Sequence, residues 1–568
     1  MWLALLLVAA NSGEKPMYPL TAEGFARFLA QHEAAVVSLE KATNLAWWEA
    51  ATTGKEEAYA RQAELQTKLE TVYTDRKAFS YLRELKAKKV VTEPKLARQL
   101  ELLYLKYLGR QFDPQLLQKI IEASTAIEQK FATFRGKVND RKVTDNQIEE
   151  VLRSSTDREE RKAFWLASKQ VGAACAADVV KVVKLRNEAA KKLGFRDFFA
   201  LQLALNEQDE AWLFRVFDEL DALTKKPFAQ IKERIDAVQA KRLKVHPEEL
   251  MPWDMADRFF QEAPNLSDVD VDAPLRDQDL VHLVAGFYRG IGLDPQAILA
   301  RSDLLERPGK NPHAFCTDID RQGDVRVLAN LKPNQYWFDT LLHELGHGVY
   351  SFYLDRSLPY FLRTEAHIFA TEGVAMLFGR LAQNGAFYQA MGLISGEDSS
   401  AFSQALEEKL RSQALIFSRW CQVMLRFEKG LYEHPDQDLD ALWWSLVERY
   451  QLLRRPPQAL PGTWASKIHI VSAPVYYHNY CLGELYASQL HEAIVNRFYP
   501  GQDPAKVVYV GNPNVGEYFK ERVFGPGASL KWDEFVRYST GKPLSAEAFA
   551  RRFIKPGGQG KTETHTAP

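Results

Sequence analysis

The chain has 568 residues, of which 46% are hydrophobic and 26% charged, and its formal net charge is -1. These values are ordinary for a globular protein, and such a balanced charge gives no electrostatic attraction to nucleic acid or to an anionic membrane. The four cysteines lie far apart and form no CxxC pair, which argues against a cysteine zinc site and a disulfide-rich scaffold. We therefore expect a large hydrophobic core and no nucleic-acid partner.

The N-terminus has some features of a signal peptide. Residues 2–10 are almost all apolar and the small residues of VAA precede Asn11, but the usual basic segment is missing. We expect residues 1–20 to be a signal peptide or a disordered N-terminus. An exported protein, periplasmic or secreted, is expected, with a cytoplasmic location as the alternative. No other apolar run reaches the length of about 18 residues that a membrane span requires, so no stable span is predicted.

Most of the remaining sequence predicts helices. Residues 21–75 are rich in Ala, Leu, Glu, Lys and Gln, and Phe25, Phe28 and Val36 recur near helical spacing. Residues 246–275 interrupt the pattern with prolines and acids and are expected to form an irregular connection. Further helices are predicted at 94–140, 145–171, 176–205, 209–245, 276–294, from 337 to about 499, and again near the C-terminus.

A β-hairpin is predicted at residues 313–330. The turn sequence DRQGD lies between HAFCTDI and VRVLAN, and both flanks contain residues that favour strands. The fold class is therefore mainly α with a small hairpin. Residues 21–555 are expected to form a single domain, and residues 556–568, rich in Gly, Pro and Thr, a disordered tail.

Residues 341–350, LLHELGHGVY, contain His343 and His347 four positions apart, with Glu344 after the first histidine. On a helix, positions i and i+4 share one face about 6 Å apart, so both imidazoles can reach one metal ion. Glu344 lies beside that face and can accept a proton from a water molecule that the metal activates. The alternative is a chance match in which both histidines are hydrogen-bonded core residues.

A catalytic zinc site needs a third protein ligand and one open position. Residues 364–377 offer Glu365, His367 and Glu372, which lie 18, 20 and 25 positions after the second histidine. We favour Glu372, because small and apolar residues follow it at helical spacing; His367 is the runner-up. A metzincin would need a histidine six positions after the second one, and a tyrosine stands there, so that class is excluded.

Hydrolysis at such a metal also needs donors for the oxyanion that develops beside it, and residues 466–484 are rich in them. Tyr477 and Tyr480 are three positions apart and would share one helix face. The alternative is a packed aromatic helix with one buried histidine. The candidate donors are Lys467, His469, Tyr476, Tyr477, His478 and Tyr480.

With these motifs the chain resembles the angiotensin-converting-enzyme family of zinc dipeptidyl carboxypeptidases, and it shares features with the related thimet oligopeptidase and oligoendopeptidase F group. The resemblance covers roughly residues 35–555 and depends on HELGH with a glutamate 25 positions later, on PHAFC, on KIHI and on YHNY. It implies a large helical two-lobed shell around a deep central cleft, with the hairpin beside the HELGH helix.

The resemblance also implies the metal ligands and the base. His343, His347 and Glu372 would bind one zinc ion per chain, and Glu344 would be the general base.

Further roles are implied for the aromatic segment. His469 would contact the scissile carbonyl and Tyr480 the oxyanion, while Lys467 would hold the terminal carboxylate of the substrate with help from Tyr477. Tyr476 is a rival of Tyr477, because one extra residue separates the histidine from the tyrosine pair.

His313 and Ala314 would pair with the substrate backbone as part of an edge strand.

Three positions depart from the family pattern. Asn479 replaces the arginine that helps to bind chloride, no glutamine for carboxylate binding lies within 251–255, and Met376 replaces a carboxylate one turn after the ligand glutamate. Chloride activation is therefore not expected.

These features together predict a zinc metallopeptidase that acts on short peptides and releases dipeptides from their C-termini, with 21–555 as the catalytic domain. The first alternative is an oligoendopeptidase that makes internal cuts, which the PWD and PVYYHNY motifs support. The second alternative, from another class, is a non-catalytic helical binding protein on the same scaffold. The presence of Glu344 and of a full ligand set argues against it.

Overall fold

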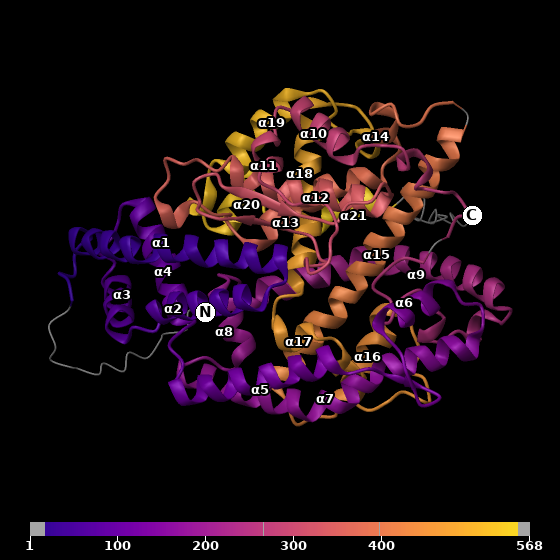
Figure 1. Ribbon diagram of the computed structural model, residues 1–568, viewed down its shortest axis with the longest axis horizontal. Coiled ribbons are helices and arrows are strands. Elements are labelled where there is room, and N and C mark those ends of the chain that lie inside the picture. The colour runs from indigo at the N-terminus through magenta and orange to yellow at the C-terminus, as the bar shows by residue number, and fades with distance from the viewer. Residues whose placement is uncertain (1–16, 265, 397, 555–568) are drawn as a thin grey trace, which may run out of the picture.

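The computed structural model describes residues 17–264, 266–396 and 398–554, and these residues are mainly helical (Figure 1). Their β structure consists of two antiparallel two-stranded sheets. The predicted fold class is thereby confirmed. Of the segments predicted to be a signal peptide or disordered N-terminus (1–20) and a disordered tail (556–568), residues 1–16 and 556–568 lie outside the described part. Residues 17–20 are described, and Tyr18 and Leu20 pack against the hydrophobic core of the first helices. Within the described part, no helix combines the length and the apolarity that a bilayer crossing requires.

The first four helices pack on one another at one end of the molecule, at the left of Figure 1. Their small hydrophobic core includes Phe25 and Leu82 and closes on Tyr360 and Phe361 from a distant part of the chain. The first helix ends where Gly54 adopts a left-handed conformation (φ 67°), which glycine adopts at no steric cost. The four helices are α1 (Ala22–Thr53), α2 (Glu56–Val72), α3 (Arg76–Lys88) and α4 (Pro94–Leu108).

A second group of helices occupies the lower part of Figure 1. The break expected between residues 171 and 176 is wrong, because one helix runs through this alanine-rich stretch. Gly172 does not interrupt that helix; it allows close packing, since a Cβ there would lie 2.4 Å from the Gly462 carbonyl oxygen. The helices are α5 (Pro114–Thr133), α6 (Asp145–Ser154), α7 (Arg158–Lys192), α8 (Phe198–Leu205), α9 (Glu210–Leu243), α16 (Leu439–Gln451) and α17 (His469–Ser472).

A third group forms the upper part, and the long helix α15 (Asp398–Glu433) packs on helices of both groups (Figure 1). One continuous hydrophobic core joins the upper and lower groups, from Ile127 to Phe553. This arrangement agrees with the two lobes that the resemblance implies, and the deep cleft stays a prediction. The upper helices are α10 (Leu280–Gly290), α11 (Gln296–Leu299), α12 (Gln335–Phe352), α13 (Ile368–Gly379), α14 (Gly385–Ala390), α18 (His478–Phe498), α19 (Pro513–Tyr518), α20 (Trp532–Thr540) and α21 (Glu547–Phe553).

The hairpin predicted at 313–330 is confirmed. Strand β3 (Phe315–Asp318) pairs antiparallel with β4 (Val325–Leu328). On the other side of β4, the Asp303 N–H donates to the Val327 carbonyl oxygen (2.9 Å), which leaves β3 as the outer strand. The observed strand begins at Phe315, two residues later than expected.

A second small hairpin begins within residues 94–140, which were predicted to be helical, and ends just after them. Strands β1 (Lys137–Val138) and β2 (Arg141–Lys142) are joined by Asn139 and Asp140, which both have positive φ (48° and 62°). Two such residues favour a tight hairpin turn, and Asn and Asp tolerate the conformation best among non-glycine residues. The local turn preference therefore ends the helical region before residue 137.

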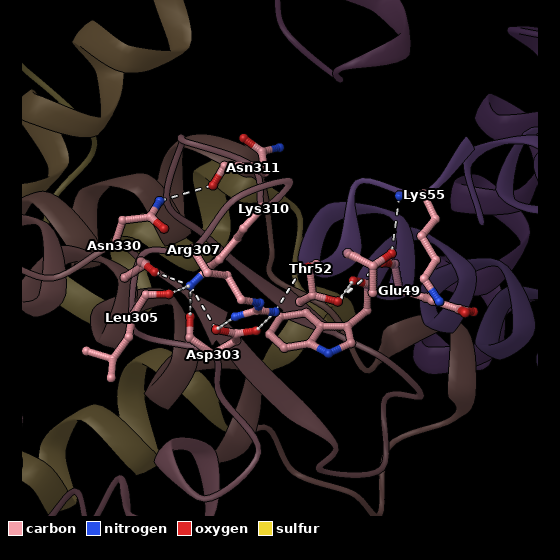
Figure 2. A network of polar contacts seen from close by, with 12 residues as sticks. Glu49, Thr52, Lys55, Asp303, Leu305, Arg307, Lys310, Asn311 and Asn330 are labelled. Atoms are coloured by element: carbon pink, nitrogen blue, oxygen red, sulfur yellow. Dashed lines mark hydrogen bonds and ion pairs between the residues drawn. The ribbon is translucent and has the colours of Figure 1, made fainter. Parts of the chain in front are cut away.

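Hydrogen bonds connect helix α1 to residues 303–311, the segment that leads into the β3–β4 hairpin (Figure 2). The Arg307 guanidinium donates to the Thr52 carbonyl oxygen (2.7 Å), and the Asn311 N–H donates to a carbonyl oxygen of α1 (2.8 Å). Lys310, whose side chain is fully buried, donates to the Asp303 carboxylate (2.8 Å) and to the carbonyl oxygen of Leu305 (2.8 Å). An internal ammonium group with several oxygen acceptors thus holds the loop in one conformation.

Lys310→Met is expected to lower stability by about 3 kcal/mol, because it leaves Asp303 and several carbonyl oxygens without their donor. Urea unfolding midpoints measure this change. The matched control is Lys332→Met, which breaks an ion pair with Glu306 whose side chains are 59% and 62% exposed. Such surface pairs contribute little. Equal shifts for the two variants would contradict the role assigned to Lys310.

Candidate functional site

Helix α12 presents the two histidines of the HELGH motif to the same side. The Asn334 side chain caps its start by accepting a hydrogen bond from the Trp337 N–H (3.0 Å). His343 and His347 follow one turn apart, and their ring centroids are separated by 4.9 Å. Burial lowers the pKa of both imidazoles, that of His343 to about 4, so both are neutral at pH 7. The neutral form is the one that binds metal.

Glu372 on α13 faces both histidines. Its Oε2 atom is 3.8 Å from Nε2 of His343 and 3.8 Å from Nε2 of His347. The ligand atoms of the three residues all lie within 4.8 Å of one another. Ligand atoms at about 2.0–2.2 Å from a tetrahedral zinc are about 3.3–3.6 Å apart, so the set fits a zinc ion after a small contraction.

The rival third ligands do not join this cluster. His367 is the N-cap residue of α13: its Nδ1 accepts a hydrogen bond from the Phe369 N–H (3.3 Å), and its Nε2 is 3.1 Å from the Asn206 carbonyl oxygen. Neither His367 nor Glu365 belongs to the ligand cluster found among the described residues. The candidate favoured from the sequence is the one that meets the histidines.

The two ligand-bearing helices approach closely because small residues separate them. A Cβ on Gly346 would lie 2.7 Å from the Cα of Ala375, and a Cβ on Gly373 would lie 2.9 Å from the Gly483 carbonyl oxygen. Such distances leave no room for a side chain. α12, α13 and α18 therefore meet backbone against backbone at the level of the ligands.

Thr371 orients one of the imidazoles. Its Oγ1 atom is 2.7 Å from Nδ1 of His347. A hydrogen bond from the Nδ1–H to this hydroxyl leaves the Nε2 lone pair free for a metal and fixes the ring plane. The sequence analysis did not identify Thr371 as this partner. The only signal in the sequence is that a hydroxyl residue directly precedes the ligand glutamate.

Glu344 lies beside the ligand cluster and is buried. Burial, and then the negative charge of Glu372, raise its pKa to about 8, while a hydrogen bond with the backbone of Cys316 lowers it. The hydrogen bond also links α12 to the outer strand β3, so the carboxyl group lies between the metal ligands and that strand.

Lys467 and Tyr477 meet at a residue that the sequence reasoning missed. The Lys467 ammonium donates to Oε1 of Gln261 (2.9 Å), and the Tyr477 hydroxyl donates to the same atom (3.4 Å). The ammonium also lies 5.2–5.5 Å from the ring centroids of Phe259, Trp420 and Tyr477. Burial lowers the pKa of Lys467 to about 8, and the nearby carboxylates oppose this shift. The lysine is therefore a buried cation at neutral pH, held by aromatic faces and one amide oxygen.

No glutamine lies within 251–255, but one from outside that stretch lies beside Lys467. The chain turns back after 251–255 and supplies Gln261 from outside that stretch. Asp257 closes the turn, since its carboxylate accepts hydrogen bonds from the N–H groups of Phe259 (2.8 Å), Gln261 (3.1 Å) and Glu262 (3.0 Å). A turn closed on one buried carboxylate fixes the direction of the Gln261 side chain.

His469 and the three tyrosines form one aromatic group. The Tyr477 ring centroid is 5.3 Å from those of His469 and Tyr480, and the Tyr476 and Tyr480 centroids are also 5.3 Å apart. Burial, and then the charge of Glu372, raise the pKa of Tyr480, so its phenol stays protonated. Burial and Lys467 lower the pKa of His469 to about 4, and its buried Nδ1 has no hydrogen-bond partner among the described residues.

The two rival tyrosines face different groups. Tyr477 shares Gln261 with the lysine, whereas the pKa of Tyr476 is raised by burial and then by Glu372. This arrangement favours Tyr477 as the partner of Lys467.

Comparison with known proteins agrees with this constellation. The family model described as angiotensin-converting enzyme matches residues 20–556. The chain belongs to the angiotensin-converting enzyme family. Among curated proteins, the chain is 23% identical over 485 residues to an angiotensin-converting enzyme of Haematobia irritans exigua, and the match covers 77% of each chain. The protein is thus a zinc metallopeptidase, with His343, His347 and Glu372 as the three-residue metal site.

Two further predicted features can be placed in the structure: the residues before β3 and the position of Asn479. His313 is exposed and Ala314 half-buried, and both precede β3, so they lie at the entrance of the outer strand and not within it. Asn479 is buried and accepts a hydrogen bond from the Gln208 amide (2.8 Å), whose oxygen contacts Nε2 of His478 (2.7 Å). Uncharged side chains fill the position where the family pattern has an arginine.

Gly346→Ala is expected to weaken zinc binding about 10- to 100-fold, because the added methyl group separates α12 from α13 and with them the histidines from Glu372. Zinc content after titration with a chelator measures this effect. Gly286→Ala in α10 is the control, since a Cβ there meets nothing within 4 Å. If Gly346→Ala retained zinc as tightly as the control does, the close approach of the helices would not set the ligand geometry.

Proposed function

We propose that this metallopeptidase is a peptidyl-dipeptidase that removes dipeptides from the free C-termini of short peptides. The observation that carries the proposal is the site around Lys467. This buried cation has Gln261 and Tyr477 as polar neighbours, and no carboxylate among the described residues lies within ion-pair distance of it. A peptide C-terminus would supply the missing anion and form a charge-assisted hydrogen bond.

The metal site and the base would perform the hydrolysis. His343, His347 and Glu372 would hold a zinc ion, which would supply Lewis-acid chemistry to the scissile carbonyl and to the attacking water. Glu344 accepts the proton of that water and delivers it to the leaving amine. Its burial between the ligands and strand β3 supports this role.

Two neutral donors would stabilise the developing oxyanion. Tyr480 keeps its phenolic proton because its pKa is raised, and His469 stays uncharged because its pKa is lowered. A hydrogen bond from each to the oxyanion would contribute about 3–4 kcal/mol to lowering the barrier. The Tyr477 ring contacts both, which ties the oxyanion donors to the carboxylate site.

The peptide backbone would add to the outer edge of β3, with His313 and Ala314 at its entrance. Strand addition recognises the main chain and accepts many side chains. The Glu344 hydrogen bond to the Cys316 backbone supports this arrangement, since it brings the strand next to the base.

Glu344→Gln is expected to retain one zinc per chain and to lose about 100- to 10,000-fold in kcat, because glutamine cannot accept the proton. Metal analysis and kinetics on a short peptide with a free C-terminus test this. Full activity in this variant would refute the proposed base.

Lys467→Met is expected to lower kcat/KM about 10- to 100-fold for peptides with a free C-terminus and to leave amidated peptides unchanged, because only the former carry the anion. Mass spectrometry of the products from a ladder of peptide lengths provides the second measurement, and dipeptides should appear first with the wild type. Internal cuts, together with equal losses on both peptide types, would favour an oligoendopeptidase.

A further inference from the structure

The turn between α17 and α18 has an unusual backbone. It connects His469 to Tyr477 and Tyr480, so its shape decides how the histidine and the tyrosines face one another. Its central residue, Val475, has φ 56°, in the left-handed region. Of the ten non-glycine residues with positive φ in the described part of the chain, Val475 alone is β-branched. A β-branched residue is a clear outlier there and needs other contacts to keep it in place.

Two buried side chains from other helices hold this segment. The Val475 N–H donates to Oε1 of Glu428 on α15 (2.8 Å). At the other end, the Arg186 guanidinium on α7 donates to the carbonyl oxygens of Val471 (2.7 Å) and Ile470 (3.4 Å). Glu428 is 2% exposed and Arg186 6% exposed. Arg186 therefore holds the start of the segment 470–475, and Glu428 holds its end.

Glu428 has no part in the hydrolysis described above. A buried carboxyl group is costly unless it binds a partner, and hydrophobic packing alone would be served equally well by an apolar side chain. Burial raises the pKa of Glu428 to about 8, and the Val475 N–H and then Arg186 lower it. The hydrogen bond that Glu428 accepts from the Val475 N–H therefore explains why a carboxyl group is buried here.

We propose that Glu428 is a positioning residue that keeps Val475 left-handed and thereby holds Tyr477 and Tyr480 in place relative to His469. The inference extends the proposed function, because it names a residue that acts through the turn and not on the substrate. Without the acceptor, the cost of the left-handed conformation would favour a relaxed turn. The start of α18, with Tyr477 at its N-cap and Tyr480 in its first turn, would then shift.

The first test compares Glu428→Met with Glu428→Gln. Methionine has a similar volume but accepts no useful hydrogen bond, whereas the glutamine oxygen still accepts the Val475 N–H. Glu428→Met should lose about 10- to 100-fold in kcat with one zinc per chain retained. Its Tm should also fall, because the buried Val475 N–H loses its acceptor and the buried Arg186 loses a nearby carboxyl group. Glu428→Gln should stay within about threefold of the wild type.

The second test uses Val475→Gly in a double-mutant cycle. Glycine adopts the left-handed conformation without steric cost, so the turn no longer needs its anchor. Glu428→Met/Val475→Gly should therefore regain about tenfold in kcat over Glu428→Met. Its Tm should nevertheless be lower, because the Val475 side chain is buried and its removal leaves a cavity. A gain in kcat that accompanies a loss in Tm would not arise from a merely structural role.

Hydrogen exchange of the segment 470–478 gives a readout that does not depend on activity. The backbone amide at position 475 should be protected in the wild type and in Glu428→Gln, and should exchange faster in Glu428→Met and in the double variant. The inference is overturned if this amide stays protected in Glu428→Met, or if the double variant is no more active than Glu428→Met. The products of the wild type test the proposed function separately. If that function is wrong, the wild type makes internal cuts instead of releasing dipeptides, and the comparisons among the variants can still be interpreted.

Discussion

The site depends on three helices that meet without intervening side chains. Gly346 and Gly373 allow α12 and α13 to approach each other and α18, and this contact brings Glu372 to 3.8 Å from both histidine Nε2 atoms. A neutral imidazole pair and a carboxylate buried together are an unfavourable cluster by themselves, because desolvation opposes the charge on Glu372. A bound divalent cation would neutralise the Glu372 charge and bind the imidazole lone pairs, which offsets this desolvation cost. The close helix packing that buries these polar groups therefore also produces a metal site.

Around this rigid centre, the functional groups on irregular segments are each fixed by a buried polar side chain. Lys310 holds the loop before the β3–β4 hairpin, Asp257 closes the turn that carries Gln261, and Glu428 holds the turn before the tyrosines. In each case an interior side chain binds backbone groups that no helix or sheet satisfies. Loops can then present polar groups to a substrate with the precision of regular structure, since unsatisfied buried backbone groups are costly.

The electrostatics of the site divide it into two halves. At neutral pH His469 and Tyr480, the proposed oxyanion donors, are uncharged, so they can donate hydrogen bonds without attracting anions. The fixed positive charge lies on Lys467, within an aromatic cage next to Gln261 and Tyr477. A peptide with a free C-terminus would be oriented by that charge, while the chemistry takes place beside the metal ligands.

The sequence by itself determined the elements whose signal is local. Helical periodicity, the DRQGD turn and the four-residue spacing of His343 and His347 each act within a few residues. The structure contains the hairpin, the paired histidines and most of the helical regions that they predict. The favoured third ligand also came from local spacing. Tertiary structure alone decided the partners: Thr371 beside His347, Gln261 beside Lys467 at a separation of 206 positions, and Glu428 behind Val475. No local pattern encodes such pairs, because they exist only when distant helices pack. A left-handed valine in particular contradicts its own local preference, and only a contact from another helix can hold it in that conformation.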